Sequence, residues 1–406
     1  MKKKYLLFGL LAPSFFSFGQ KSTDTTIYKK QRLKEIDIQV LCSYYTQEGN
    51  HSAVTGGTGT EELSVYAPEA TLAYRPDSVH TITFNAGADV ITSASTDKID
   101  FVISSASRVD VRSHVNLGYS RRLGHSGITA GINTGLSIES DYTSLPLGLS
   151  FSYTNPDASR EVQVRLQAYF DDLRWGRLDK EYYRPVRLVY PVELRYKDWF
   201  SIYRRNSYNL NLALYQVINK RIQAAFMPEL VYQNGLLSTP FHRVYFRSEF
   251  LPRVENLPQE RWKVPLGLQV NIFAARRIIL RTYYRFYWDN FGITAHTLQL
   301  EVPVKVSPQW TITPHFRFYT QTASTYFLPY KEHLATELFY TSDYDLSSFN
   351  SYKTGITLRY APQSRFLKSF FFTEAGLRYA WYKRTDGLSA HMVTLLFDLK
   401  YLKIKQ

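Results

Sequence analysis

Arginine occurs once or twice in each of several segments of this chain, at positions that would share one face of an extended strand. Arg281 and Arg285, four residues apart, show the spacing. A guanidinium presents a planar fork of N–H donors that suits anions. If such a face lines a water-filled path, we expect the path to prefer a small anion. The candidate residues for this path are Arg165, Arg281, Arg285, Arg317, Arg359, Arg378, Glu301, Glu374 and Tyr283.

Glutamates on the same faces allow a second interpretation of the arginines. Glu229, Glu301 and Glu374 are available as counter-ions. Arginine–glutamate pairs, together with a loop folded inward, would then fill the interior and select no ion. The sequence leaves both interpretations open.

The histidines and acidic residues form no recognisable metal-binding motif. The chain has nine histidines, but no HxH, HExxH or Cys/His spacing. We therefore expect no metal site and no cofactor. The loop Asp343-Tyr344-Asp345 could hold Ca²⁺ with the help of backbone carbonyls, and a solvated loop is the alternative.

An enzymatic function has little support in the sequence. Ser238, His242 and Asp343 supply the residue types of a hydrolase triad, but no nucleophile elbow is present. The run Gly56-Gly57-Thr58-Gly59 lacks the Lys-Ser/Thr pair and the helix of a phosphate-binding loop, so it is expected to form a flexible or tightly turned loop. The chain is predicted not to be an enzyme.

The segments that carry the arginines are predicted to be β-strands, whose side chains alternate between two faces. Residues 276–288 show this pattern well. One face holds Ile278, Leu280, Thr282, Tyr284, Phe286 and Trp288, and the other holds Arg281, Tyr283, Arg285 and Tyr287. Strands of this kind, filling a whole chain, indicate either soluble sandwiches or one barrel in a membrane.

The alternation predicts about sixteen strands, and an even number returns both ends of the chain to one side of a barrel. They are residues 34–45, 61–74, 79–91, 111–122, 127–139, 144–154, 159–170, 207–218, 221–233, 263–274, 276–288, 295–306, 309–321, 351–361, 369–382 and 388–402.

The connections between these strands alternate in length. Short turns such as 75–78 and 155–158 contain the Pro, Asp and Asn that tight turns need. Long connections fall at 46–60, 92–110, 171–206, 234–262 and 322–350. This sorting is typical of periplasmic turns and extracellular loops. The sequence therefore predicts an all-β fold, a transmembrane antiparallel up-and-down β-barrel with short periplasmic turns and long extracellular loops.

Composition agrees with a membrane barrel. Aromatic residues make up 16% of the chain, with 32 Tyr and 26 Phe, as expected for aromatic girdles at two interfaces. The net charge of +14 comes from arginines spread over many strands and not from one nucleic-acid-binding module, so no nucleic-acid partner is expected. Attraction to lipopolysaccharide at the outer surface explains the basic excess more simply.

The N-terminus has the pattern of a secretory signal. Lys2, Lys3 and Lys4 precede an apolar stretch, and Ser17 and Gly19 supply small residues at a cleavage site before Gln20. We expect a signal peptide at 1–19, a basic periplasmic tail at 20–33 and an outer-membrane barrel at 34–406. Insertion would then involve outer-membrane lipid and the barrel-assembly machinery.

The loop 234–262 is unusually apolar for a solvated loop, so it is expected to pack against another surface. That is either the lumen, as a plug or constriction, or a partner protein at the cell surface. Loops 46–60 and 322–350 are expected to pack with it. The candidate plug or docking residues are Phe241, His242, Arg243, Tyr245 and Phe246.

Several segments resemble an outer-membrane barrel family found mainly in Bacteroidota and known as a domain of unknown function, numbered 3570. The resemblance rests on residues 55–61, 87–97, 215–219, 235–246, 255–258 and 339–347, and it extends over most of the mature chain. It implies the barrel fold and the outer-membrane location, and it implies no activity.

Two functions follow from these features. In the first, the barrel is a pore or transporter that passes a small, anionic solute along its Arg/Tyr face. In the second, the barrel is occluded and anchors a multi-protein envelope complex. Its outer loops or its N-terminal tail would then dock the partner.

Overall fold

The computed structural model of the protein describes residues 33–93, 109–124, 126–139, 143–173, 203–239, 242–362, 364–367 and 369–404. The predicted signal peptide 1–19 and the tail 20–33, apart from Leu33, lie outside the described residues. So do 94–108 and 174–202, which form most of two of the predicted long loops.

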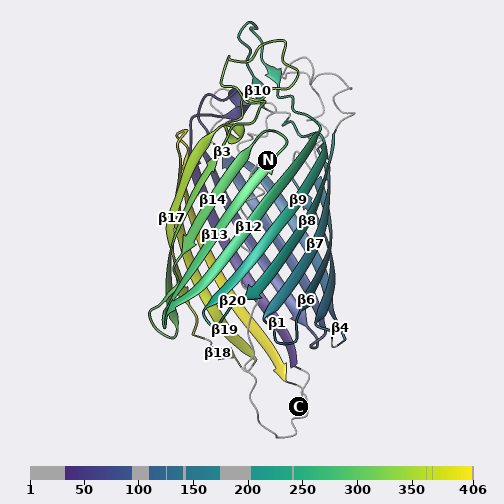
Figure 1. The fold of residues 1–406 in the computed structure, drawn as a ribbon, viewed down its shortest axis with the longest axis vertical. Helices are drawn as coiled ribbons and strands as arrows, with labels where there is room; N and C mark the ends of the chain where they lie inside the picture. The colour runs from purple at the N-terminus through teal and green to yellow at the C-terminus, as the bar shows by residue number, and fades with distance from the viewer. Residues whose placement is uncertain are drawn as a thin grey trace.

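One antiparallel sheet closes into a barrel (Figure 1). Its strand segments are β1 (Leu33–Glu48), β2 (Leu63–Arg75), β3 (His80–Ser93), β4 (Val109–Leu123), β5 (Ile128–Ile138), β6 (Thr143–Thr154), β7 (Arg160–Asp172), β8 (Arg204–Val217), β9 (Ile222–Gly235), β12 (Glu260–Ala275), β13 (Ile278–Asp289), β14 (Thr294–Glu301), β15 (Val304–Lys305), β16 (Trp310–Gln321), β17 (Phe349–Tyr360), β18 (Ser364–Leu367), β19 (Phe370–Arg384) and β20 (Ser389–Ile404).

These eighteen segments build sixteen wall strands, because β15 continues β14 between β13 and β16, and β18 continues β17 beside β19. The predicted all-β barrel of sixteen strands is confirmed. β1 pairs with β20 from Leu33 opposite Ile404 to Glu48 opposite Ser389, and this pairing closes the barrel. Closure leaves no open sheet edge, as a strand-built membrane protein requires.

One predicted strand, 295–306, is wrong as a continuous element. It is divided into β14 and β15 at Val302 and Pro303. Proline has no backbone N–H to donate to a neighbouring strand, so the ladder is interrupted there. Val302 still donates its N–H to the Pro314 carbonyl, 3.0 Å away, which keeps the two halves in one wall strand.

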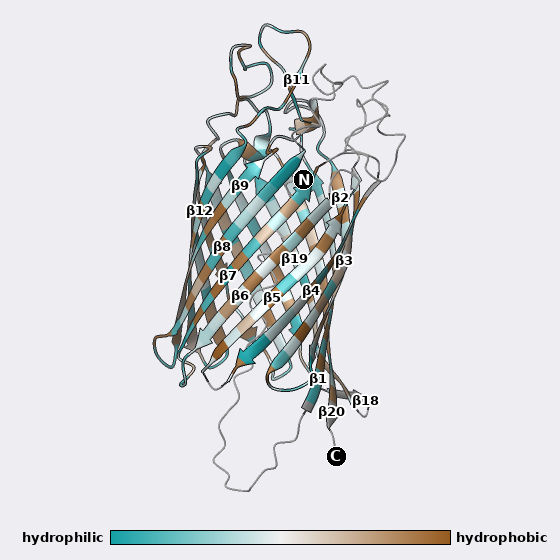
Figure 2. Ribbon diagram, turned by 90° about the vertical axis from the view of Figure 1, so that its right-hand side faces the viewer, coloured by the Kyte–Doolittle hydropathy of each residue, from teal (hydrophilic) through white to brown (hydrophobic). Residues whose placement is uncertain are grey.

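The outer surface of the wall is apolar. Ile132, Leu117 and Leu298 expose more than half of their surface, and their strand neighbours point the other way. Hydrophobic and hydrophilic residues alternate along the strands in Figure 2. A closed barrel with such a surface is the architecture of outer-membrane barrels. Within the described ranges, no helix combines the length and apolar character needed to cross a membrane.

Aromatic side chains gather near both ends of the wall. Tyr232 stacks against Trp262 with ring centroids 4.4 Å apart near the ends of their strands. At the opposite end, Trp310 lies 4.7 Å from Tyr360 and Phe370 lies 4.9 Å from Tyr401. These rings form the two girdles that the Tyr and Phe content predicts.

Short turns lie at one end of the barrel and long loops at the other. β1 begins and β20 ends at the short-turn end, at the bottom of Figure 1. At the other end, three loops fold together, and we call the assembly of residues 49–62, 236–239, 242–259 and 322–348 the loop cap. It contains the two-stranded ribbon β10 (Arg243–Val244) with β11 (Arg253–Val254) and two short 3-10 turns, η1 (Ala53–Thr55) and η5 (Tyr344–Leu346).

Candidate functional site

Four of the predicted inner-face arginines pair with glutamates. Arg285 lies 3.0 Å from Glu229 and Arg359 lies 2.5 Å from Glu374. Glu301 is shared, with Arg281 at 4.0 Å and Arg378 at 3.4 Å. Two of the pairs, Arg281–Glu301 and Arg359–Glu374, join adjacent wall strands, and the other two reach over strands that lie between. The structure therefore brings all three predicted glutamates into contact with predicted arginines.

Arg317 lies in a row of polar side chains that the strand register aligns across five wall strands. Gln299, Arg317 and Lys353 stand directly opposite one another on β14, β16 and β17. Tyr283 of β13 and Tyr382 of β19 continue the row at its two ends. All five side chains can donate a hydrogen bond. Next to them in sequence, Leu298, Phe316 and Tyr352 are exposed on the outer surface, so the row faces inward.

Two cations in this row, Arg317 and Lys353, are register partners. Among the residues that the structure describes, neither forms an ion pair with a carboxylate. Like charges directly opposite each other destabilise a sheet. Together with Arg281 and Arg378 they set four cations against the single carboxylate of Glu301, and we call these five residues the cationic patch. A bound or passing anion would offset their repulsion.

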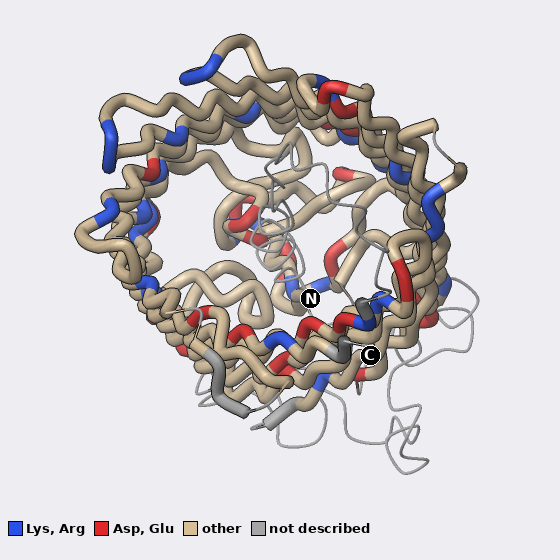
Figure 3. Tube along the Cα trace, turned by 90° about the horizontal axis from the view of Figure 1, so that it is seen from below, with Lys and Arg blue, Asp and Glu red and all other residues tan. Residues whose placement is uncertain are grey.

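The cationic patch lies just below the loop cap. Lys353 is four residues from the start of β17, and Arg317 is four residues from the end of β16, at the ends where the long loop 322–348 joins these strands. Four residues of strand span about 13 Å, and less along the tilted barrel axis. Seen along the axis, chain segments at the far end lie across the ring (Figure 3). Any solute entering from the cap side therefore meets these cations early.

Arg165 lies away from the patch, on β7. It lines a cavity of about 290 Å³ in the inner wall together with Gly118, Asn133, Ser150 and Gln167. Small residues on β4 and β6 leave this space. In the described part of the chain, Arg165 has no carboxylate partner.

Carboxylates on β1, β2, β3 and β20 also face inward. Glu35 and Asp37 pair with Arg75 and Lys400 near the short-turn end. On β3, Asp89 pairs with Arg112 of β4. Glu69 of β2 and Asp398 of β20 contact the amides of Asn85 and Gln39, so carboxylates outnumber cations on this part of the wall, in contrast to the cationic patch.

The loop cap is an ordered structure with its own apolar cores. Val244, Phe246 and Tyr340 form one core, and Phe246 is fully buried. Backbone hydrogen bonds join Asn256 to Tyr340 in both directions, at 3.1 and 2.7 Å. These contacts connect the loop after β9 with the loop after β16, as the sequence analysis expects.

The Gly-rich loop after β1 is fitted tightly into the cap. Gly56 and Gly57 both have positive φ, and a Cβ on Gly57 would stand 2.7 Å from the Ser342 carbonyl oxygen. His51 stacks on Tyr344 with ring centroids 3.7 Å apart. Burial in this packing raises the pKa of Tyr344, so its phenol stays neutral at physiological pH. The run is therefore a tight turn that packs against the other two loops.

Four of the five predicted plug or docking residues are described, and they take different places in the cap. Phe241 lies outside the described residues. Arg243 belongs to β10, Tyr245 packs 4.8 Å from the Tyr330 ring, and Phe246 lies inside the cap. His242 lies between two acidic side chains, 3.5 Å from Glu255 and 3.3 Å from Asp343.

The predicted Ca²⁺ ligands Asp343 and Asp345 do not converge on one site. The Asp343 carboxylate faces His242, whereas Asp345 pairs with Arg384 at 2.6 Å. Of the imagined triad, His242 and Asp343 are close together. The Ser238 hydroxyl instead accepts a hydrogen bond from the Leu257 backbone N–H at 2.8 Å.

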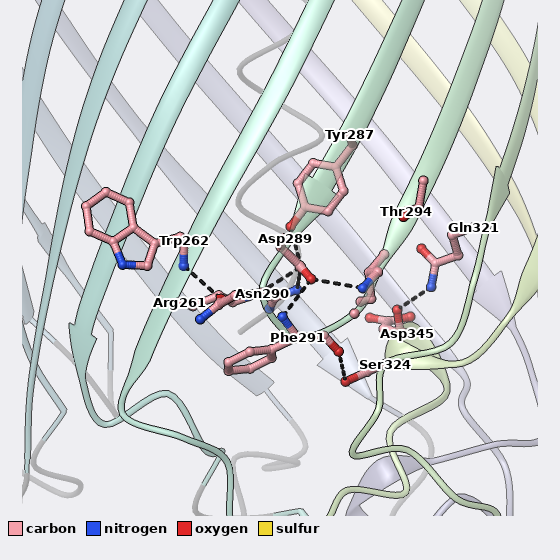
Figure 4. A network of polar contacts seen from close by, with 12 residues as sticks. Arg261, Trp262, Tyr287, Asp289, Asn290, Phe291, Thr294, Gln321, Ser324 and Asp345 are labelled. Atoms are coloured by element: carbon pink, nitrogen blue, oxygen red, sulfur yellow. Dashed lines mark hydrogen bonds and ion pairs between the residues drawn. The ribbon is translucent and has the colours of Figure 1, made fainter.

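A buried carboxylate anchors the cap to the barrel rim (Figure 4). Asp289, with no exposed surface, accepts hydrogen bonds from the Arg261 guanidinium at 3.0 Å and from the Tyr287 hydroxyl at 2.7 Å. The backbone N–H groups of Phe291 and Ile293 donate to it at 3.0 Å each. Asp289 thus fixes the turn between β13 and β14.

That turn carries the second apolar core of the cap. Phe291 and Ile293 pack with Leu257 from the loop after β9 and Leu346 from the loop after β16. The Arg261 guanidinium lies 4.5 Å above the Phe291 ring. The Asp289 network therefore supports contacts that join three connections of the barrel.

The structure adds two residues to those predicted. Lys353 has the same strand parity as Arg359, six residues later, and this parity places both inside. Asp289 stands at the end of β13 before an Asn-Phe-Gly turn, a position that suits a side chain capping backbone N–H groups. Both signals are present in the sequence.

Residues 19–385 match the family model described as "Protein of unknown function (DUF3570)". The chain belongs to this family. The predicted resemblance to the DUF3570 family is thus confirmed over most of the chain. Among proteins with curated functions, none matches the sequence.

Several solved structures have a similar outline. A bacterial polysaccharide outer-membrane secretin is 10% identical, with a TM-score of 0.47, and the match covers 91% of this chain and 98% of that one. OccK1 (OpdK) from Pseudomonas aeruginosa is 9% identical, with a TM-score of 0.41, and 91% and 99% are covered. A BenF-like porin from Pseudomonas fluorescens Pf-5 is 8% identical, with a TM-score of 0.43, and 90% and 98% are covered. Likeness at this level does not indicate a solute for this DUF3570 protein.

Proposed function

We propose that this protein is a non-enzymatic outer-membrane pore that passes small anions, with the cationic patch as its filter. The observation that carries the proposal is the register pair Arg317 and Lys353, two inward-facing cations without a carboxylate partner in the described chain. Tyr283, Gln299 and Tyr382 extend the pair with neutral donors. A wall of this kind attracts anions and hydrogen-bonds them in passing.

The location in the outer membrane is part of the proposal. An apolar belt with two aromatic girdles needs lipid around it, and the basic N-terminus at 1–19 has the pattern of an export signal. Lipid and lipopolysaccharide would contact the outer surface of the wall. The barrel-assembly machinery would insert the chain.

The direct test is conductance of the purified mature protein in a planar lipid bilayer under a salt gradient. We expect discrete single-channel steps and a reversal potential whose sign indicates anion preference. The loop cap narrows the entrance, so the steps should be small and should increase when the cap is opened by limited proteolysis. Absence of current both before and after proteolysis would contradict the pore function. Preference for cations would contradict the role of the cationic patch as an anion filter.

A second function, a docking platform for an envelope protein, is favoured by one feature of the cap. Phe250, Leu251 and Leu338 expose 96%, 68% and 70% of their surface at its tip. The hydrogen bond from Arg253 to the Ala335 carbonyl, 3.4 Å long, places the two loop tips side by side. Exposed apolar residues that are grouped in this way mark interaction surfaces.

Crosslinking in intact cells tests this platform. A photoreactive residue at position 250 should give one discrete crosslinked protein, and the same residue at Asp157, in a short turn at the other end, should not give that protein. The double variant Phe250→Ser/Leu251→Ser should prevent co-purification of the partner and leave conductance intact. Absence of any crosslink at position 250 would contradict the platform.

A further inference from the structure

Three titratable side chains from two loops meet inside the loop cap. His242 and Glu255 come from the loop after β9, and Asp343 comes from the loop after β16. One ligand-type atom from each lies within 4.8 Å of the other two. The two carboxylates are almost fully buried, with 1% and 6% of their side-chain surface exposed, and His242 is 15% exposed. We call these residues the cap triad.

Two distances within the cap triad fit a metal site. The His242 Nδ1 atom lies 3.5 Å from Glu255 Oε1 and 3.3 Å from Asp343 Oδ2. Both distances exceed the usual length of a charge-assisted N–H···O hydrogen bond. A tetrahedral ion with ligands at about 2.0–2.2 Å holds its ligand atoms about 3.4 Å apart. The two measured distances match this separation.

The carboxylates are also held in place by their surroundings. The Thr239 backbone N–H donates to Glu255 Oε2 at 2.6 Å, and the Thr341 hydroxyl donates to Oε1 at 2.5 Å. The Asp345 backbone N–H donates to Asp343 Oδ1 at 2.8 Å, which leaves Oδ2 directed at His242. Hydrogen bonds of this kind orient metal ligands and tune their affinity.

The charge of the cap triad also favours a bound cation. Two buried carboxylates this close repel each other, and removing them from water costs further free energy. A divalent cation between them offsets both effects. One imidazole nitrogen with two carboxylate oxygens suits a first-row transition metal such as Zn²⁺, whereas Ca²⁺ prefers six to eight oxygen ligands.

We propose that His242, Glu255 and Asp343 bind a divalent transition-metal ion, with Zn²⁺ as the best fit, and that the ion joins the two long loops of the cap. The fourth position would hold water or an external ligand, since the His242 side reaches solvent. The sequence alone predicts no metal, because the three ligands are separated by 13 and 88 residues and form no motif (255 − 242 and 343 − 255). This inference is independent of anion conduction.

The test uses the full mature protein in detergent micelles, purified with a tag that contains no histidine and stripped of metal with EDTA. Calorimetric titration with Zn²⁺ should give one site per chain with micromolar or tighter affinity. Millimolar Ca²⁺ should not displace the ion. Zn²⁺ should also slow tryptic cleavage within the cap, because it joins the loops that carry Arg247 and Lys331.

Two matched variants decide the assignment. His242→Gln should lower the affinity by at least about tenfold, a loss that changes around a ligand already produce. His51→Gln removes a histidine from the same cap, where it stacks on Tyr344, and should bind Zn²⁺ like the wild type. Trypsin digestion of the two variants in the absence of metal shows whether either substitution disrupts the cap. No binding to the wild type, or equal binding by His242→Gln with an intact cap, would overturn the proposal.

Discussion

The double variant Arg317→Gln/Lys353→Gln should lose most of the anion preference of the pore. These two cations form no ion pair with a carboxylate among the described residues, so their charge is available to a passing ion. In a largely aqueous lumen, each is worth about 0.5–1 kcal/mol at a separation of ~6–8 Å. The anion-to-cation permeability ratio should therefore fall about fivefold or more. Reversal potentials in a salt gradient measure this ratio directly.

A charge-neutral control separates this effect from a general disturbance of the wall. Arg359→Gln/Glu374→Gln removes an ion pair and leaves the net charge of the lumen unchanged. Its permeability ratio should stay at the wild-type value. The single variants Arg317→Gln and Lys353→Gln should each give an intermediate ratio. A double variant that keeps full anion preference would place the filter elsewhere, with the Arg165 cavity as the next candidate.

Asp289→Asn should release the loop cap from the barrel rim. The change leaves the Arg261 guanidinium without its carboxylate, and the new NH₂ group must face either the Arg261 and Tyr287 donors or the two backbone donors. Removing one partner of a buried ion pair costs about 3–5 kcal/mol. The second apolar core, which contains Phe291 and Ile293, should loosen with it. Limited trypsin digestion should cleave the cap of this variant much faster than that of the wild type.

The barrel itself should stay folded in the Asp289→Asn variant, because the wall depends on strand pairing far from the rim. Heat-modifiable migration on a gel tests this. Glu249→Gln is the matched control, since Glu249 pairs with Arg253 on the cap surface and surface pairs contribute little. Slow cleavage of Asp289→Asn, equal to that of Glu249→Gln, would show that the network does not anchor the cap. The released cap should also raise conductance.

The wall of this protein could be predicted from sequence because its signals are local. Alternation of apolar and polar residues with period two identifies each strand and its two faces. The alternation of short turns with long loops distinguishes the two ends of the barrel. Pro303 shows the limit of this approach. The pattern around it reads as one strand, and the break depends on a backbone N–H that proline lacks.

The candidate sites were only partly predictable. Parity places Arg317 and Arg359 inside, and the same parity places Lys353 there. That Arg317 and Lys353 stand opposite each other depends on the register between β16 and β17, which the long loop 322–348 does not fix. The cap triad and the Asp289 network join segments from different loops. Such contacts leave no periodic trace along the chain.

The pairing of β1 with β20 also governs how this chain folds. Leu33 and Ile404 belong to the first and last wall strands, so the contact that completes the cylinder closes a longer loop than any other strand pairing in the barrel. Contacts between residues so distant in sequence are slow to form. Until β20 arrives, β1 exposes a row of unsatisfied N–H and C=O groups that other chains can pair with. The protein is therefore most prone to aggregation just before its final strand docks, and whatever holds the nascent chain must protect its first strand for longest.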